Sequence, residues 1–131
     1  MPKRSLLLPF LKKYDNLSQV MTDHKLASLG DAYVNFVCSI ASSKRKREPS
    51  SAKVKGKMLG EALKRAGLRG CLPSRMNQHA FADAAEALIV YAWLCDYVTL
   101  EDSVTMLGKT DDLIKGLTEL LTTIKGKVKF S

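Results

Sequence analysis

The most apolar stretch of the sequence reads Ala80-Phe-Ala-Asp-Ala-Ala-Glu-Ala-Leu-Ile-Val-Tyr-Ala-Trp-Leu-Cys95. A helix that is hydrophobic almost all round is normally buried at the centre of its domain, so we expect this segment to be the core helix. Two acids interrupt it, Asp83 and Glu86, and their spacing puts them on one face. Like charges this close repel each other and lose hydration, which a divalent cation held by carboxylate oxygens would offset. The alternative is that both acids lie near the start of the helix and face water.

The chain around this stretch has the composition of one globular domain. Of its 131 residues, 46% are hydrophobic and 26% are charged, which excludes disorder over most of the length. We therefore expect a single domain over residues 1–131, with no secretory signal and no membrane span. Cys38, Cys71 and Cys95 are an odd number and lack C-x-x-C spacing, which favours reduced thiols in a cytoplasmic protein and no zinc site.

Hydrophobic periodicity predicts helices along the whole chain. One or two helices are expected over about residues 16–42, and further helices over about residues 54–66 and 77–97 and from about residue 110 onward. Asn77 can cap the start of the third helix, and Gly67 can cap the end of the second. No alternating strand pattern of useful length is present, so the fold class is all-α, with five to seven helices.

Positive charge is concentrated in one part of the sequence. The formal net charge is +8, and residues 44–75 hold eleven Lys or Arg against two Glu, a balance of +9. A concentrated basic segment is typical of proteins that bind a polyanion, most often nucleic acid. Its first part is expected to be a basic loop over residues 42–52, for which a merely solvated loop is an equal alternative. On the helix that follows, Lys53, Lys57 and Lys64 should form a basic stripe opposite the apolar face.

Asp31 is a third candidate acid. It follows Gly30 inside a helical pattern, where glycine costs about 1 kcal/mol relative to alanine unless close packing or function requires it. Its neighbours one turn away include Ala27 and Val34, so Asp31 borders a second apolar face and could point into a cleft between helices. An ordinary surface aspartate is the alternative.

Three segments together resemble a known family. They are Leu26-Ala-Ser-Leu-Gly-Asp-Ala-Tyr-Val-Asn-Phe-Val37, Val54-Lys-Gly-Lys-Met-Leu-Gly-Glu-Ala-Leu-Lys-Arg-Ala-Gly-Leu68 and Ala82-Asp-Ala-Ala-Glu-Ala-Leu-Ile89. In this order they resemble the ribonuclease III catalytic domain, most strongly over residues 20–100. The resemblance implies an all-α domain that forms a homodimer. It also implies that Asp31, Asp83 and Glu86 surround Mg²⁺, or Mn²⁺, and cleave double-stranded RNA.

One position departs from the family pattern. The family has a glutamate four residues before the helix aspartate, and this chain has Ala27 there. A small bacterial branch, mini-ribonuclease III, has an alanine at the same place and is still a nuclease. It also lacks the double-stranded-RNA-binding domain of larger members, which we expect to be absent from this chain too.

The combined expectation is a metal-dependent endoribonuclease acting in RNA processing on double-stranded or structured RNA. Duplex RNA is recognised mainly by shape and backbone, so the RNA contacts are assigned to exposed cations. These are Lys53, Lys55, Lys57, Lys64 and Arg75. Two alternatives remain: a ribonuclease III fold that has lost cleavage and serves as an RNA-binding or scaffolding protein, and an unrelated basic helical binder. His24 and His79 are interpreted as ordinary surface residues. The dimer interface is expected on the helix of Tyr33 and Phe36 or on that of Tyr91 and Trp93.

Overall fold

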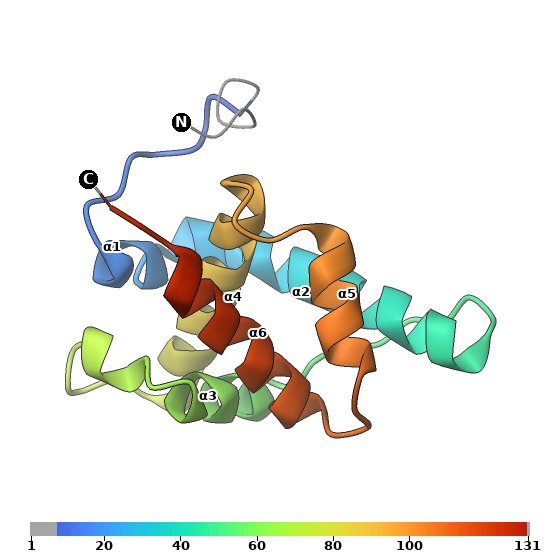
Figure 1. Cartoon of the computed structure of the whole chain (residues 1–131). Helices are drawn as coiled ribbons and strands as arrows, with labels where there is room; N and C mark the ends of the chain where they lie inside the picture. Colours follow the sequence, from blue (N-terminus) through green and yellow to red (C-terminus); the bar gives the residue numbers. More distant parts are fainter. Residues whose placement is uncertain (1–7, 131) are drawn as a thin grey trace.

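The computed structural model describes residues 8–130, which form six α-helices and one turn of 3-10 helix and, within that range, no strand (Figure 1). The helices in chain order are α1 (Leu17–Met21), α2 (His24–Lys46), α3 (Gly56–Arg65), the 3-10 turn η2 (Arg69–Cys71), α4 (Gln78–Leu94), α5 (Leu100–Gly108) and α6 (Leu113–Lys127). The predicted all-α class is confirmed. Over the same residues, no helix combines the length and the apolar run that crossing a lipid bilayer requires.

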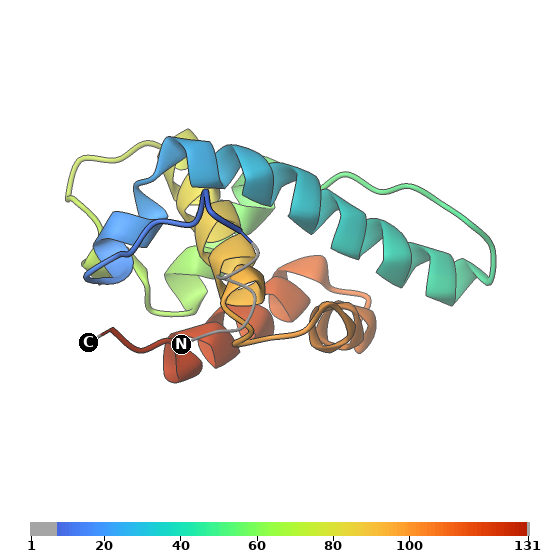
Figure 2. The same ribbon diagram turned by 90° about the horizontal axis from the view of Figure 1, so that it is seen from above.

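Helix α4 is the centre of the molecule. It packs against α1, α2, α3 and α6, and 12 of its 17 residues are buried. Figures 1 and 2 show it crossing beneath α2, with α3 and α6 on its other sides. Asn77 caps its start by accepting a hydrogen bond from the Ala80 backbone N–H at 2.9 Å. The prediction of a buried core helix that begins after Asn77 is confirmed.

Helices α2 and α4 cross in close contact at Gly30. A Cβ atom built on Gly30 would lie 2.1 Å from the backbone oxygen of Glu86 and 2.5 Å from its carbonyl carbon. No side chain fits into that space, so the helix-interior glycine is required by packing. The glycine therefore brings the next residue, Asp31, beside the Glu86 turn of α4.

Helix boundaries differ from the predictions at both ends of the basic segment. Helix α2 does not end at Ser42 but continues to Lys46, where Arg47 closes it in the left-handed conformation with φ 58°. The expected basic loop over residues 42–52 therefore begins only at Arg47. Helix α3 begins at Gly56, so Lys53 and Lys55 precede it. The three-lysine stripe on one helix is thus wrong for Lys53, and only Lys57 and Lys64 share a face of α3.

Helix α5 was not expected from periodicity. Its start carries a reciprocal cap: the Asp102 backbone N–H donates to Thr99 Oγ1 at 3.0 Å, and the Thr99 N–H donates to the Asp102 carboxylate at 3.0 Å. The Thr-x-x-Asp spacing is a variant of the capping-box signature, so a local signal for this helix was present in the sequence. Helix α6 begins at Leu113, three residues after the expected start, and Asp112 caps it by accepting from the Lys115 N–H.

Candidate active site

The structure brings the three candidate acids together where α2 crosses α4. Asp31 lies on α2 directly after the glycine contact, and Asp83 and Glu86 lie one turn apart on α4. Glu86 is 7% exposed, the Asp83 side chain is 45% exposed, and Asp31 is exposed. The cluster therefore has a buried floor and an open side. The alternative in which both α4 acids face water does not describe Glu86, which is buried, whereas Asp31 does lie at the surface.

The surroundings of Glu86 disfavour its charge. Burial, a side-chain hydrogen bond with Asp31, and the charges of Asp31 and Asp83 together raise the pKa of Glu86 to about 8. The carboxyl group therefore holds a proton at neutral pH unless a cation replaces it. A strongly raised carboxyl pKa within a cluster of acids is typical of functional sites.

The donor set fits a hard divalent cation. Carboxylate oxygens are the ligands that Mg²⁺ and Mn²⁺ prefer, and a cation would offset the mutual repulsion of the three acids. Across residues 8–130, however, no three His, Cys, Asp or Glu side chains already stand in the arrangement of a metal-ligand set. The acids would thus have to adjust their side chains on binding, with loss of the Glu86 proton. The position at which the resembled family has a fourth acid is Ala27, which is 4% exposed in α2 and supplies no ligand.

Two polar residues border the acids and were not assigned to the site from the sequence. His24, at the start of α2, is largely exposed and places Nδ1 3.8 Å from Asp83 Oδ2. Asn35, one turn after Asp31, donates from Nδ2 to Asp31 Oδ1 at 3.3 Å. The sequence did contain a signal for the Asn35 contact, because residues four apart on a helix lie on the same face and Asn35 is four residues after Asp31. The contact of His24 depends on the crossing angle of α2 and α4, for which the sequence offers no signal.

The basic residues lie on the neighbouring helix and loops. All five assigned cations are exposed: Lys53, Lys55, Lys57, Lys64 and Arg75. Helix α3 starts beside the acids, because a Cβ on Gly56 would lie 3.5 Å from Cβ of Ala82, the residue before Asp83. Further along α3, a hollow is lined by Lys57, Met58, Gly60, Glu61, Lys64, Met76, Gln78, Phe81 and Ile114. Lys64 Nζ lies 5.3 Å from the Phe81 ring centre and the Arg69 guanidinium lies 5.0 Å from it, so Arg69 joins the basic surface.

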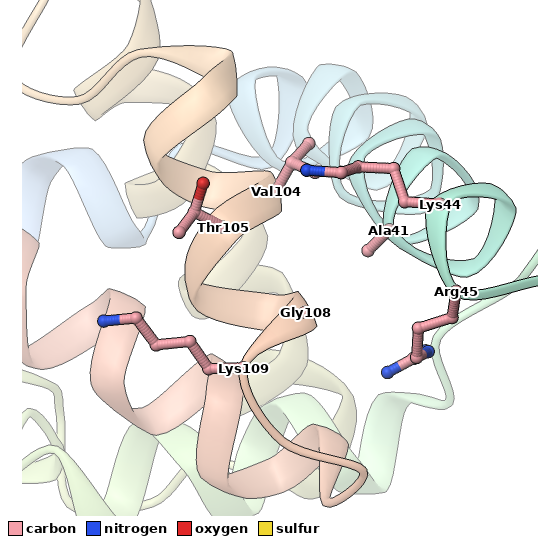
Figure 3. Close-up of a pocket in the computed structure, with 7 residues that line it drawn as sticks. All are labelled: Ala41, Lys44, Arg45, Val104, Thr105, Gly108 and Lys109. Atoms are coloured by element: carbon pink, nitrogen blue, oxygen red, sulfur yellow. The ribbon is translucent and has the colours of Figure 1, made fainter. Parts of the chain in front are cut away.

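A second hollow, between the end of α2 and α5, contains no acid (Figure 3). It is lined by Ala41, Lys44, Arg45, Val104, Thr105, Gly108 and Lys109. Two of its cations have partners at the rim: Arg45 donates to the Thr110 carbonyl at 3.4 Å, and Lys109 pairs with Glu119 at 3.4 Å. Figure 3 shows the Lys109 amine directed away from Arg45. The hollow therefore lacks the carboxylates of a divalent-metal site, and the acid cluster is the candidate site.

Acids gathered from two helices beside an exposed basic surface are typical of nucleases, which bind a polyanionic backbone. A family model described as Ribonuclease III matches residues 24–127, and the chain belongs to the ribonuclease III family. The matched region includes all three acids and the basic segment, and the family gives the chain a ribonuclease-related role of the nuclease type. No curated protein matches the chain.

Proposed function

We propose that this protein is a divalent-metal-dependent endoribonuclease that hydrolyses phosphodiester bonds in double-stranded or structured RNA. The observation that carries the proposal is the buried Glu86 carboxyl at the α2–α4 crossing, which interacts with Asp31 and Asp83. Asp31 and Asp83 lie on the open side of that crossing. A buried acid among other acids destabilises the fold once it is ionised, so its presence calls for a function. RNA processing in the cytoplasm agrees with three cysteines that are free thiols.

Asp31, Asp83 and Glu86 are the residues that would hold Mg²⁺ or Mn²⁺. A bound divalent cation supplies Lewis acidity, activating a water molecule and neutralising the charge that develops on the phosphate. Glu86 must release its proton to take part, and the packing of α4 fixes its position. Asp83, half exposed, and Asp31, exposed, face the side from which RNA can approach.

The exposed cations would bind the RNA backbone. Lys57 and Lys64 lie on one face of α3, whose first turn is next to the acids, and Arg75 lies in the loop before α4. The A-form duplex presents phosphates and 2′-hydroxyl groups rather than readable base edges, so this surface should select duplex shape with low sequence preference. Lys53 and Lys55 lie on the segment between α2 and α3 and extend the same set of contacts.

A second copy of the chain would supply the other half of the enzyme. Among the described residues, the exposed large hydrophobic side chains are Phe10, Leu29 and Phe36. Leu29 and Phe36 are seven residues apart on α2, share one face and are 40% and 53% exposed, whereas Tyr91 on α4 is buried. The interface is therefore proposed on α2. Sedimentation velocity should show a dimer that Leu29→Ser with Phe36→Ser converts to monomer.

The cleavage experiment separates this enzyme from an inactive RNA-binding protein, the alternative favoured by Ala27. Purified protein with Mg²⁺ should cut a long RNA duplex, and Glu86→Gln or Asp83→Asn should abolish cleavage while changing duplex affinity little. Glu119→Gln is the matched control, because Glu119 is an exposed acid on α6 that pairs with Lys109. A wild-type protein that binds duplex but leaves it intact at saturating Mg²⁺ and Mn²⁺ would support the inactive alternative instead.

A further inference from the structure

Residues 50–55 form an extended strap that runs back along α2 (Figure 2). Serine side chains of α2 form hydrogen bonds with the backbone of the strap, as a neighbouring strand does in a β-sheet. The Ser50 N–H donates to Ser43 Oγ at 2.8 Å. The single proton of the Ser43 hydroxyl has two acceptors in reach, the Ser50 carbonyl at 3.0 Å and the Ser39 carbonyl of its own helix at 2.8 Å. In the same way the Ala52 N–H donates to Ser39 Oγ at 2.9 Å, and the Ser39 hydroxyl has two acceptors in reach, the Ala52 carbonyl at 3.2 Å and the Asn35 carbonyl of α2 at 2.7 Å.

The next rung of this ladder is Asn35. Its Oδ1 accepts a hydrogen bond from the Val54 N–H at 2.8 Å. The three α2 side chains are four residues apart, about 6 Å along a helix, while their partners are two residues apart, about 6.6 Å along an extended chain. The two repeats match closely enough for three successive rungs.

The hydrogen bonds between α2 and the strap also determine which way the lysines of the strap face. Because side chains of an extended segment alternate in direction, the residues bound to α2 turn inward and those between them turn outward. Val54 is buried, whereas Lys53 and Lys55 are exposed. The ladder therefore presents these two lysines to solvent along the side of α2.

Asn35 also contacts the candidate metal site. A backbone N–H can only donate, so the oxygen of the Asn35 amide must face Val54, and the NH₂ group is left to donate to Asp31 Oδ1 at 3.3 Å. A serine is too short to reach both groups, and an aspartate lacks the donor. One side chain thus links the last rung of the strap to an acid of the cluster.

We infer that Asn35 is a positioning residue that couples RNA binding on the strap, through Lys53 and Lys55, to the orientation of Asp31. The inference rests on the proposed function, because it assigns the strap to RNA backbone contact and Asp31 to the metal. When RNA holds the strap in place, Val54 fixes the Asn35 amide, and the amide in turn fixes the Asp31 carboxylate.

Three variants separate the two ends of this link. Asn35→Ala removes the contacts to both Val54 and Asp31. Ser39→Ala removes the strap contacts of Ser39 together with its bond to the Asn35 carbonyl of its own helix, at 2.7 Å, but leaves the Asn35 side chain in place. Asn35→Gln keeps both functional groups. Thr118→Ala is the control, because the Thr118 hydroxyl donates only to its own helix, to Ile114 O at 2.7 Å. Each variant is measured for duplex affinity in EDTA by fluorescence anisotropy, for single-turnover cleavage at saturating protein, and for Mn²⁺ affinity by calorimetry.

Ser39→Ala and Asn35→Ala should both weaken duplex affinity, by about three- to tenfold, and flatten its salt dependence. Only Asn35→Ala should also lower the single-turnover rate and the Mn²⁺ affinity by about tenfold or more, the usual size of an effect on a residue that orients a metal ligand. Asn35→Gln should recover part of both. If Asn35→Ala acted only by lowering stability, duplex affinity, cleavage rate and Mn²⁺ affinity would all fall together, and Asn35→Gln would not restore them.

The inference is overturned if Asn35→Ala matches Ser39→Ala in cleavage rate and Mn²⁺ affinity, or if Ser39→Ala binds duplex like Thr118→Ala. Failure of the proposed function looks different, because the wild-type protein then does not cleave. In that case the Mn²⁺ and duplex affinities of the same four variants still decide whether Asn35 links the strap to Asp31.

Discussion

Replacing Gly30 by alanine tests the helix crossing on which the candidate site depends. In an ordinary helix interior this substitution stabilises by about 1 kcal/mol, because alanine is the better helix former. Here the new methyl carbon would lie 2.1 Å from Glu86 O, and ordinary van der Waals contact begins near 3.4 Å. Helices α2 and α4 must therefore separate by about 1 Å, an overpacking cost of about 3 kcal/mol.

The net expectation for Gly30→Ala is a loss of about 2 kcal/mol in the free energy of unfolding, or roughly 8 °C in the melting temperature. Thermal and urea unfolding measure it. Gly126→Ala in α6 is the matched control, because nothing lies within 4 Å of a Cβ there, and it should stabilise by up to about 1 kcal/mol. If Gly30→Ala raised stability as Gly126→Ala does, the close crossing would be wrong. The separation should also abolish cleavage, because it moves Asp31 away from Glu86.

Three further results are expected. Burial, and after it the contacts with Asp31 and Asp83, raise the pKa of Glu86 to about 8, so the free energy of unfolding in EDTA should fall by several kcal/mol as the pH rises from about 4.5 to 8. Glu86→Gln should remove this pH dependence. Urea titrations of both proteins across the pH range measure it. Lys57→Ala with Lys64→Ala should reduce the slope of log affinity against log salt for duplex RNA by about two units in an anisotropy titration, and an unchanged slope would make these lysines merely solvated. Ala27→Glu should lower the melting temperature in EDTA, because the substitution places a charged group at a position that is 4% exposed. If that position faces the three acids, calorimetry should show that the variant binds Mn²⁺ more tightly than the wild-type protein does.

The fold was predictable wherever the information is local. The apolar content of the 80–95 stretch identified α4 as the core helix, and the caps at Asn77 and Gly67 are present, the latter with φ 77°. Helix α5 was missed because it is a short helix of nine residues, identified by its cap more than by its periodicity. The end of α2 was misplaced because Ser42 and Ser43 look like helix-ending residues. Ser43 instead bonds to the strap, a contact that a pattern along the chain does not reveal.

The three acids could be predicted, but not the groups that support them. Asp83 and Glu86 stand out because charge is rare in a buried helix, whereas Asp31 was assigned to the site through the family resemblance, because its local pattern alone also fits an ordinary surface aspartate. The role of Asn35 depends on a partner 19 residues away in the chain, and the contact of His24 depends on the angle between two helices. Both are tertiary properties. The position of Lys53 was wrong for the same reason, because hydrogen bonds to α2 hold it in an extended segment where periodicity alone favours a helix.

Several violations of ordinary helix chemistry meet at one place in this molecule. Gly30 weakens the interior of α2, Glu86 places a carboxyl in the core, and Asn35 and Ser39 use side chains in mid-helix to bind backbone outside it. Each would be costly or neutral elsewhere, and sequences tend to depart from local rules where function requires it. All of these residues contact the α2–α4 crossing or the strap beside it. Their convergence supports the acid cluster as the functional site by a route that does not depend on the family match.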